Sequence, residues 1–262
     1  MLAIRTAAQA APAADPLLAY LRLEIRRSLR NRRYLIFTVV FPVLLYVMYT
    51  AVVPADSSGG TLDGLTWPVY FLVSMAAYGA IGAAMSQAVP VAMERRQGWA
   101  RQLRVTPLSS RAYVAVKVLS AVLLTVPALA LVGLAGALIN HVPIAVGPWL
   151  VTIAVMAVAS VPFAALALLL GYLLDPESAQ GAMVLTYFSL AILGGLFAPL
   201  ESLPDAIATI GRMLPSSHFA SLGRDLVAGR LPDPVDIAVL AAWTIALGAL
   251  AAWRFRVDER AG

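Results

Sequence analysis

Six stretches of the sequence contain no Asp, Glu, Lys or Arg, and this feature limits the fold more than any other. They cover residues 34–55, 64–93, 118–140, 142–174, 178–200 and 237–253. Five of them exceed the roughly 20 residues that a helix needs to cross about 30 Å of hydrocarbon, and 237–253 lies at the lower limit. Because lipid offers the backbone no hydrogen bonds, these continuous apolar runs predict an all-α membrane protein with six transmembrane helices.

The composition agrees with this prediction. The chain of 262 residues is 61% hydrophobic and 13% charged, against about 45–50% apolar and about 25% charged residues in an ordinary soluble domain. One globule of this size cannot hide that much apolar surface. The composition therefore excludes a soluble enzyme, a disordered chain and a fibrous repeat.

Basic residues are distributed unevenly among the loops. Seven arginines precede the first stretch, six basic residues lie between the second and the third, and three follow the sixth. The remaining three lie between the fifth and the sixth, among five acidic residues. Since Lys and Arg are retained on the cytoplasmic side, this pattern predicts a multi-pass protein of the bacterial plasma membrane with both termini in the cytoplasm.

Residues 1–14 are predicted to form a flexible tail, and residues 15–33 an amphipathic helix that precedes the transmembrane domain, 34–262. Apolar and basic side chains of this helix each recur every four positions. The apolar stripe is Leu17, Leu21, Ile25 and Leu29, and the basic stripe is Arg22, Arg26 and Arg30. Such a helix lies in the membrane interface, with its arginines toward anionic lipid headgroups. A helix that only follows the positive-inside rule, or one that also docks a cytoplasmic partner, would show the same pattern.

The loop between the second and third stretches, 94–109, has a residue pattern that fixing the membrane topology alone would not require. Gly98 and Pro107 interrupt it, and a short helix between them would place Trp99 and Leu103 on one side. Arginines would occupy the other sides. The alternative is a charged loop that only fixes the topology.

This loop resembles a motif of bacterial type-2 ATP-binding-cassette (ABC) exporter permeases. The matching residues are Glu94, Gly98, Leu103 and the run Thr106-Pro107-Leu108-Ser109. The resemblance implies that the segment is a coupling helix, seated in a groove of a separate nucleotide-binding ATPase subunit that carries ATP and Mg. The residues it assigns to this coupling are Glu94, Arg95, Gly98, Trp99, Arg101, Leu103, Arg104, Thr106 and Pro107.

A second resemblance covers 194–220, from the last residues of the fifth stretch onward. In the same family this span ends at a glycine-rich break followed by short external helices. Apolar residues recur at helical spacing from Leu203 to Leu214, but the stretch is too short to span. The implied re-entrant external segment includes Gly194, Gly195, Phe197, Pro199, Leu203, Pro204 and Pro215. An ordinary periplasmic loop is the alternative.

Several kinds of chemistry lack the residues they need. The chain has no cysteine and two histidines, so a multi-His or thiolate metal site is not expected. Its single lysine, Lys117, is not part of a glycine-rich phosphate loop, and we expect its ammonium to snorkel to the cytoplasmic surface. His141 and His218 fall in predicted external loops, which disfavours an intramembrane hydrolase.

The centres of the six stretches carry no ionisable side chain for a coupling ion, so energy for uphill transport would come from outside the membrane region. With the resemblance, this predicts a non-enzymatic permease subunit that binds no cofactor or nucleic acid. Its expected partners are an ATPase subunit, a second identical or related permease subunit, and membrane lipids. The expected cargo is hydrophobic or amphipathic: a drug, an antibiotic, a lipid or a lipid-linked glycan. A passive channel or a structural subunit of a membrane complex is the alternative.

Overall fold

The computed structural model describes residues 16–52, 61–98, 109–142 and 145–261, and their regular structure is helical throughout. The elements, in chain order, are α1 (Pro16–Leu29), α2 (Arg32–Leu35), the π-helix η1 (Ile36–Val40), α3 (Phe41–Val52), α4 (Trp67–Met85), α5 (Ala88–Arg96), α7 (Ser110–Ile139), α8 (Val146–Ala159), α9 (Val161–Leu173), α10 (Pro176–Leu193), the 3-10 helix η2 (Leu200–Ser202), α11 (Asp205–Gly211), α12 (Pro215–Val227) and α13 (Pro234–Ala261). The all-α prediction is therefore confirmed for the described residues.

Four helical segments are long and apolar enough to cross a membrane. They are Trp67–Arg96, Ala112–Ile139, Val146–Leu173 and Pro234–Val257. Each corresponds to one of the six predicted spans, with ends shifted by a few residues. The chain is therefore a multi-pass membrane protein by the length and composition of its helices.

The helices in the other two predicted spans are not among the four that are long and apolar enough to cross a membrane. The apolar helix in the first stretch, Ile36–Val52, is shorter than a full span. In the fifth, α10 begins two residues before the stretch with the polar turn that contains Glu177, and it ends at Leu193 rather than residue 200. It stops there because Gly194 and Gly195 follow, and Gly195 adopts φ +75°, which only glycine takes without strain.

Two of the four spans are interrupted rather than straight. The helical hydrogen-bond ladder breaks between α4 and α5, where the Ser86 amide and hydroxyl both donate to the Ala83 carbonyl and Pro90 follows. A similar break separates α8 from α9, where the Ser160 hydroxyl donates to the Ala157 carbonyl and Pro162 lacks an N–H. Proline and serine at such breaks are a common cause of helix kinks.

Helix α4 forms the centre of the bundle, and α13 lies at its outside. Of the 18 most apolar consecutive residues in each span, 83% are buried in Trp67–Arg96, which contains α4, but only 22% in Pro234–Val257, which belongs to α13. Helices α3, α7 and α12 pack on α4, while α13 packs mainly on α9. Gly79 permits the close approach of η1 to α4, since a Cβ there would lie 2.7 Å from the Thr38 carbonyl oxygen.

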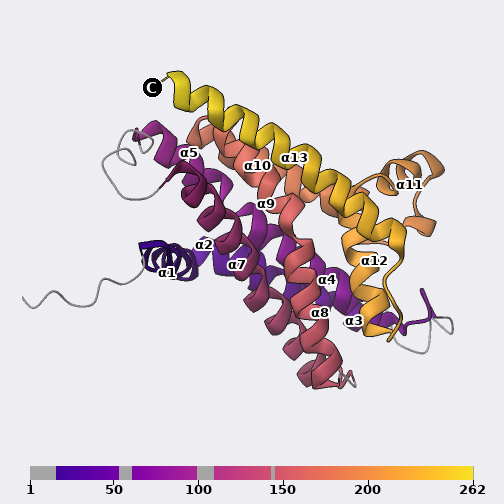
Figure 1. Cartoon of the computed structure of the whole chain (residues 1–262). Coiled ribbons are helices and arrows are strands. Elements are labelled where there is room, and N and C mark those ends of the chain that lie inside the picture. The colour runs from indigo at the N-terminus through magenta and orange to yellow at the C-terminus, as the bar shows by residue number, and fades with distance from the viewer. Residues whose placement is uncertain (1–15, 53–60, 99–108, 143–144, 262) are drawn as a thin grey trace, which may run out of the picture.

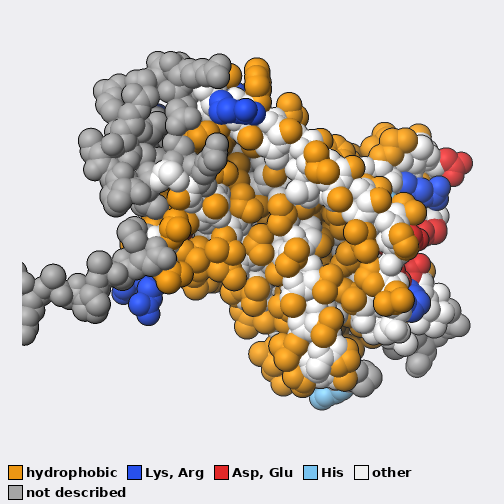
Figure 2. Space-filling model, in the orientation of Figure 1, with side chains coloured by type: hydrophobic (Ala, Val, Ile, Leu, Met, Phe, Trp, Pro, Cys, Tyr) orange, Lys and Arg blue, Asp and Glu red, His pale blue; other side chains and the backbone are white. Residues whose placement is uncertain are grey.

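The bundle has two distinct ends (Figure 1). Helix α1, the last turn of α5 and the carboxyl end of α13 lie at one end, and α11 and α12 lie near the other. On the face shown in Figure 2, hydrophobic side chains cover the middle, with Lys or Arg at the first end and both signs of charge at the second. An apolar belt between charged ends is the surface expected of a membrane-spanning bundle.

Candidate functional site: a buried charge cluster beside an amphipathic cavity

The single lysine of the chain is fully buried at the end of the bundle where α1, α5 and α7 meet. Lys117, from α7, has no exposed side-chain surface. Its Nζ lies 2.7 Å from Glu94 Oε1 and 3.0 Å from Glu24 Oε1. The expectation that this ammonium snorkels to the surface is therefore wrong, because two carboxylates bind it inside the protein.

Glu94 is the centre of this cluster. Its Oε1 accepts from Lys117 and, at 3.3 Å, from Arg27 Nη1, while its Oε2 accepts from the Tyr113 hydroxyl at 2.6 Å. Its side chain is 9% exposed, whereas that of Arg27 is 54% exposed. Two carboxylates and two cations thus balance, and hydrogen bonds satisfy the buried charges as their burial requires.

Two tyrosines close the cluster on its apolar side. The rings of Tyr20 and Tyr113 stack with their centroids 6.2 Å apart, and Lys117 Nζ lies 5.9 Å and 5.5 Å from them. Both distances fall within the range of cation–π attraction. Burial, reinforced by the carboxylates of Glu94 and Glu24, raises the pKa of Tyr20 far above its ordinary value, so its hydroxyl stays protonated.

The burial of Lys117 makes a direct chemical prediction. In the folded protein, an amine-acylating reagent should modify Lys117 on the order of a hundredfold more slowly than a lysine peptide, because reaction requires local opening. Peptide mass spectrometry would follow the modification, and the same sample in denaturant is the control. Rapid modification of the folded protein would contradict the buried ion pairs.

The carboxyl end of α5 is also tied to α9 and α10. Arg95 donates through Nη1 to the Tyr172 carbonyl and through Nη2, at 3.0 Å, to the Leu174 carbonyl, and so caps the end of α9. Arg96 pairs with Glu177 in the first turn of α10 at 3.0 Å. That turn is capped by Asp175, whose pKa is lowered by hydrogen bonds from the Ser178 N–H and hydroxyl.

The predicted coupling residues fall into two groups. Glu94 and Arg95 are used inside the chain, as described above, and Gly98 ends α5 with φ +72°. Glu94 therefore faces the interior of this subunit, between α1 and α7. The remaining residues of the set, Trp99, Arg101, Leu103, Arg104, Thr106 and Pro107, lie outside the described residues.

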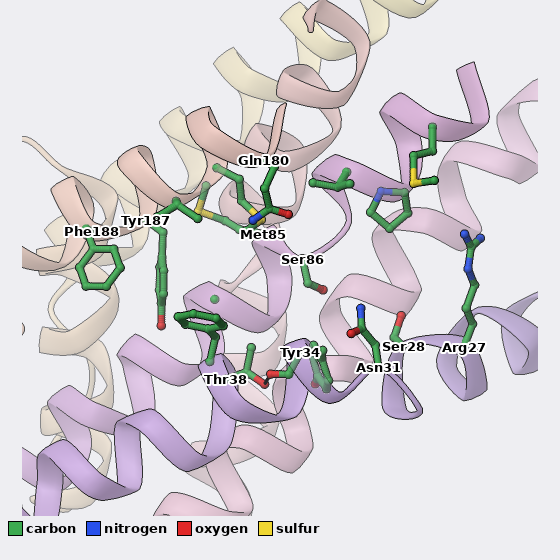
Figure 3. Close-up of a pocket in the computed structure, with 17 residues that line it drawn as sticks. Arg27, Ser28, Asn31, Tyr34, Thr38, Met85, Ser86, Gln180, Tyr187 and Phe188 are labelled. Atoms are coloured by element: carbon green, nitrogen blue, oxygen red, sulfur yellow. Dashed lines mark hydrogen bonds between the residues drawn. The ribbon is translucent and has the colours of Figure 1, made fainter. Parts of the chain in front are cut away.

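A cavity of about 460 Å³ lies next to the cluster, between α1, η1, the α4–α5 break and α10. In Figure 3, Arg27, Ser28 and Asn31 gather at one end, and Tyr187 and Phe188 from α10 lie at the other. Met85 lies between them in Figure 3, and Met183 also lines the cavity. The cavity thus has its charged residue at one end, and apolar side chains mixed with Thr38, Ser86 and Gln180 over the rest. Arg27 belongs both to this cavity and to the cluster.

The predicted interface helix packs on α7 through a different face from its leucine stripe. Tyr20 and Glu24 are buried, and of the stripe Leu21 and Ile25 are half-buried while Leu17 and Leu29 are exposed. Arg22, Arg26 and Arg30 are exposed. Exposed arginines beside exposed leucines are compatible with a membrane interface, and this role stays a prediction.

The segment after α10 contains the short helices η2, α11 and α12. Gly194 caps α10 and Gly195 turns the chain, Phe197 packs on Tyr78 at 5.0 Å between ring centroids, and Pro199, Leu203 and Pro204 flank η2 and α11. Pro215 opens α12. The next residue, Ser216, donates to the Leu190 carbonyl at 2.7 Å, which folds α12 back against α10.

At the same end of the bundle, an ion pair joins the loop before α4 to helix α12, and a hydrogen bond joins it to the loop between α12 and α13. Arg224 lies 2.9 Å from Asp63 and over the Tyr70 ring, and Arg230 pairs with Asp225 at 2.8 Å while donating to the Asp63 carbonyl. Among the described residues, no group of three His, Asp or Glu side chains is placed to hold a metal ion.

Sequence reasoning missed four residues of the cluster: Tyr20, Glu24, Arg27 and Tyr113. A signal was present, since Glu24 is the only acidic residue among the arginines of α1 and Tyr20 stands one turn before it. The leucine stripe instead indicated that another face of this helix was the functional one. Three-dimensional packing was needed to join residues that lie up to 97 positions apart, from Tyr20 to Lys117.

Two comparisons with known proteins agree with this architecture. Residues 63–253 match the family described as ABC-2 family transporter protein. The chain is 30% identical over 237 residues to the protein named "Putative transport permease YvfS" of Bacillus subtilis (strain 168), an alignment that covers 90% of this chain and 95% of the relative. The match covers the cluster residues Glu94, Tyr113 and Lys117 and most of the bundle. The chain belongs to the ABC-2 family of transporter permeases, the non-catalytic membrane subunits of ABC transporters.

Proposed function

We propose that this chain is the six-span permease subunit of an ABC exporter, that both its termini are cytoplasmic, and that it dimerises with an identical or related subunit. Family membership implies a nucleotide-binding ATPase as partner. The uneven distribution of Lys and Arg among the loops supports the orientation. On this proposal, Ile36–Val52 and α10 complete the set of spans.

We also propose that the segment 94–109 couples the permease to the ATPase subunit. The buried cluster is the observation that supports this proposal. It joins α1, α5 and α7 at one point, and α5 and α7 are the helices that flank residues 97–109. A movement of residues 97–109 would therefore displace α1, α5 and α7 together rather than one helix alone. This rigid-body transmission is a common route from a partner subunit to a membrane domain.

The amphipathic cavity supports a hydrophobic or amphipathic cargo such as a drug, an antibiotic, a lipid or a lipid-linked glycan. Its volume of about 460 Å³ lies within the roughly 300–1,000 Å³ of small-molecule sites. Three methionines and two phenylalanines line it. Flexible thioethers accommodate apolar ligands of varied shape. Export is the direction that predominates in the family that this sequence resembles.

The proposal that the segment 94–109 couples the permease to the ATPase is tested at Gly98 and Pro107, between which the short helix of this segment is predicted. Gly98→Val and Pro107→Ala should lower ATP-driven movement of hydrophobic dyes into everted vesicles by about tenfold, the upper part of the range for coupling mutations. ATP hydrolysis by the reconstituted complex should stay within about twofold, since neither residue touches nucleotide. Gly248→Ala, where an added Cβ meets nothing within 4 Å, is the matched control.

Unchanged dye movement in both variants would remove the coupling-helix proposal. Charge reversal at Glu94 is a less direct test than it seems from the sequence alone. Glu94 is buried against Lys117, so a reversed charge would disturb folding together with coupling.

A further inference from the structure

The cavity carries one formal charge among its described lining residues, and this charge is positive. Arg27 lies at its polar end together with Ser28 and Asn31, and no Asp or Glu lines it. A cation facing a small cavity without an acidic lining residue favours a ligand that brings an anionic group to that end.

Arg27 is not committed entirely to the cluster. Its contact with Glu94, at 3.3 Å, is longer than the 2.7 Å contact between Lys117 and Glu94, and its side chain is 54% exposed. A guanidinium has five N–H donors in a planar fork that fits phosphate, sulfate or carboxylate oxygens. The Arg27 side chain can therefore accept a second anionic partner.

The walls beyond Arg27 fit an alkyl chain. Met85, Tyr187 and Phe188 lie away from Arg27 in Figure 3, and Met183 also lines the cavity. Tyr187 is itself held in place, because its hydroxyl donates to the Tyr78 carbonyl at 3.0 Å and its ring stacks on Tyr78 at 4.4 Å. One wall is thus rigid and aromatic, while the methionines can adjust to a chain of varied shape.

We propose that this cavity binds an amphiphile with one anionic headgroup, which pairs with Arg27 while its alkyl chain lies along Met183, Tyr187 and Phe188. The headgroup competes with Glu94 for the Arg27 guanidinium. A bound ligand therefore weakens the contact of Arg27 with Glu94, the residue that holds the end of α5 between α1 and α7. The inference rests on the proposed function in taking this amphiphile as cargo, but binding is measured without the ATPase.

The probe is radiolabelled dodecyl phosphate, added to the full chain in phosphatidylcholine nanodiscs, with empty nanodiscs subtracted. Arg27→Gln should weaken binding by about tenfold, the size of a charge-assisted hydrogen bond. Arg26→Gln, an exposed arginine of the same helix that does not line the cavity, should stay within about twofold of wild type. Glu94→Gln should strengthen binding about threefold, because the competing carboxylate is gone.

Two further arms test the walls and the source of the anion. Met183→Trp should weaken binding by narrowing the cavity, whereas Leu185→Trp, on the exposed side of α10, should not. Nanodiscs doped with phosphatidylglycerol should compete with the probe if a phospholipid headgroup is the natural occupant. Undiminished probe binding in those nanodiscs would instead assign the cavity to single-chain anionic amphiphiles.

Equal binding by wild type and Arg27→Gln would overturn the inference, and so would equally strong displacement of the probe by dodecyltrimethylammonium. Thermal unfolding of each variant separates lost binding from lost structure. Failure of the probe to bind, in a chain that still couples to its ATPase through Gly98 and Pro107, would refute this inference and leave the proposed function standing.

Discussion

Replacing Lys117 with methionine is expected to lower the free energy of unfolding by about 3–5 kcal/mol, the usual cost of removing one partner of a buried ion pair. Methionine keeps an unbranched side chain, one atom shorter than that of lysine, but leaves Glu24 and Glu94 facing each other without their shared cation. Arg27 then balances only one of the two carboxylates. The effect is large because the remaining negative charge is buried, not because the ion pair itself contributes that much.

Heating the detergent-solubilised protein and following its loss from size-exclusion chromatography would measure this effect. The midpoint should fall by about 10 °C, given a few degrees for each kcal/mol in a protein of this size. Glu24→Gln in the Lys117→Met background should recover more than half of the loss, since the unpaired carboxylate is gone. Leu119→Met, an exposed residue of the same helix, is the control. Melting of Lys117→Met at the wild-type temperature would contradict the structure.

A second large effect is expected when Trp99 and Leu103 are both replaced by aspartate. Their spacing of four residues would place them on one side of a short helix, and the proposed groove of the ATPase would bury that side. A buried aromatic anchor of an interface contributes about 2 kcal/mol or more, so ATPase retained by the purified permease should fall at least about 30-fold.

Quantitative mass spectrometry of the tagged permease would give the ratio of ATPase to permease. Gln102→Ala, on another side of the same predicted helix, should leave the ratio unchanged. An unaltered ratio in the Trp99→Asp, Leu103→Asp variant would show that the segment 94–109 does not dock the ATPase. Thermal stability of the permease is the control for folding and should be the same in both variants.

The long spans were predictable because their signal is local. A continuous apolar run of membrane-spanning length favours a membrane helix through its own composition, and four of the six runs coincide with candidate spans within a few residues of their predicted ends. Ile36–Val52 and α10 are different. Their ends depend on where a π-helical turn begins and on Gly195 taking φ +75°, and neither follows from hydropathy.

The charge cluster could not be predicted for a different reason. A sequence shows that Lys117 stands at the end of an apolar run, and a lysine in that position usually snorkels. Whether it does so depends on which carboxylates lie within reach. Here Glu24 and Glu94 come from two other helices that pack around α7. The motif that contains Glu94 suggested a contact with a partner, whereas the structure uses that carboxylate to hold its own helices together.

The measurement that tests the central claim most directly is purification of the tagged chain from its native membrane in mild detergent, followed by mass spectrometry and an ATPase assay. The account predicts that a nucleotide-binding subunit co-purifies in equal amount, hydrolyses ATP, and is lost when the segment 94–109 is disrupted. A chain that purifies without any nucleotide-binding subunit, under conditions that keep other membrane complexes intact, would contradict it and favour a channel or a structural subunit.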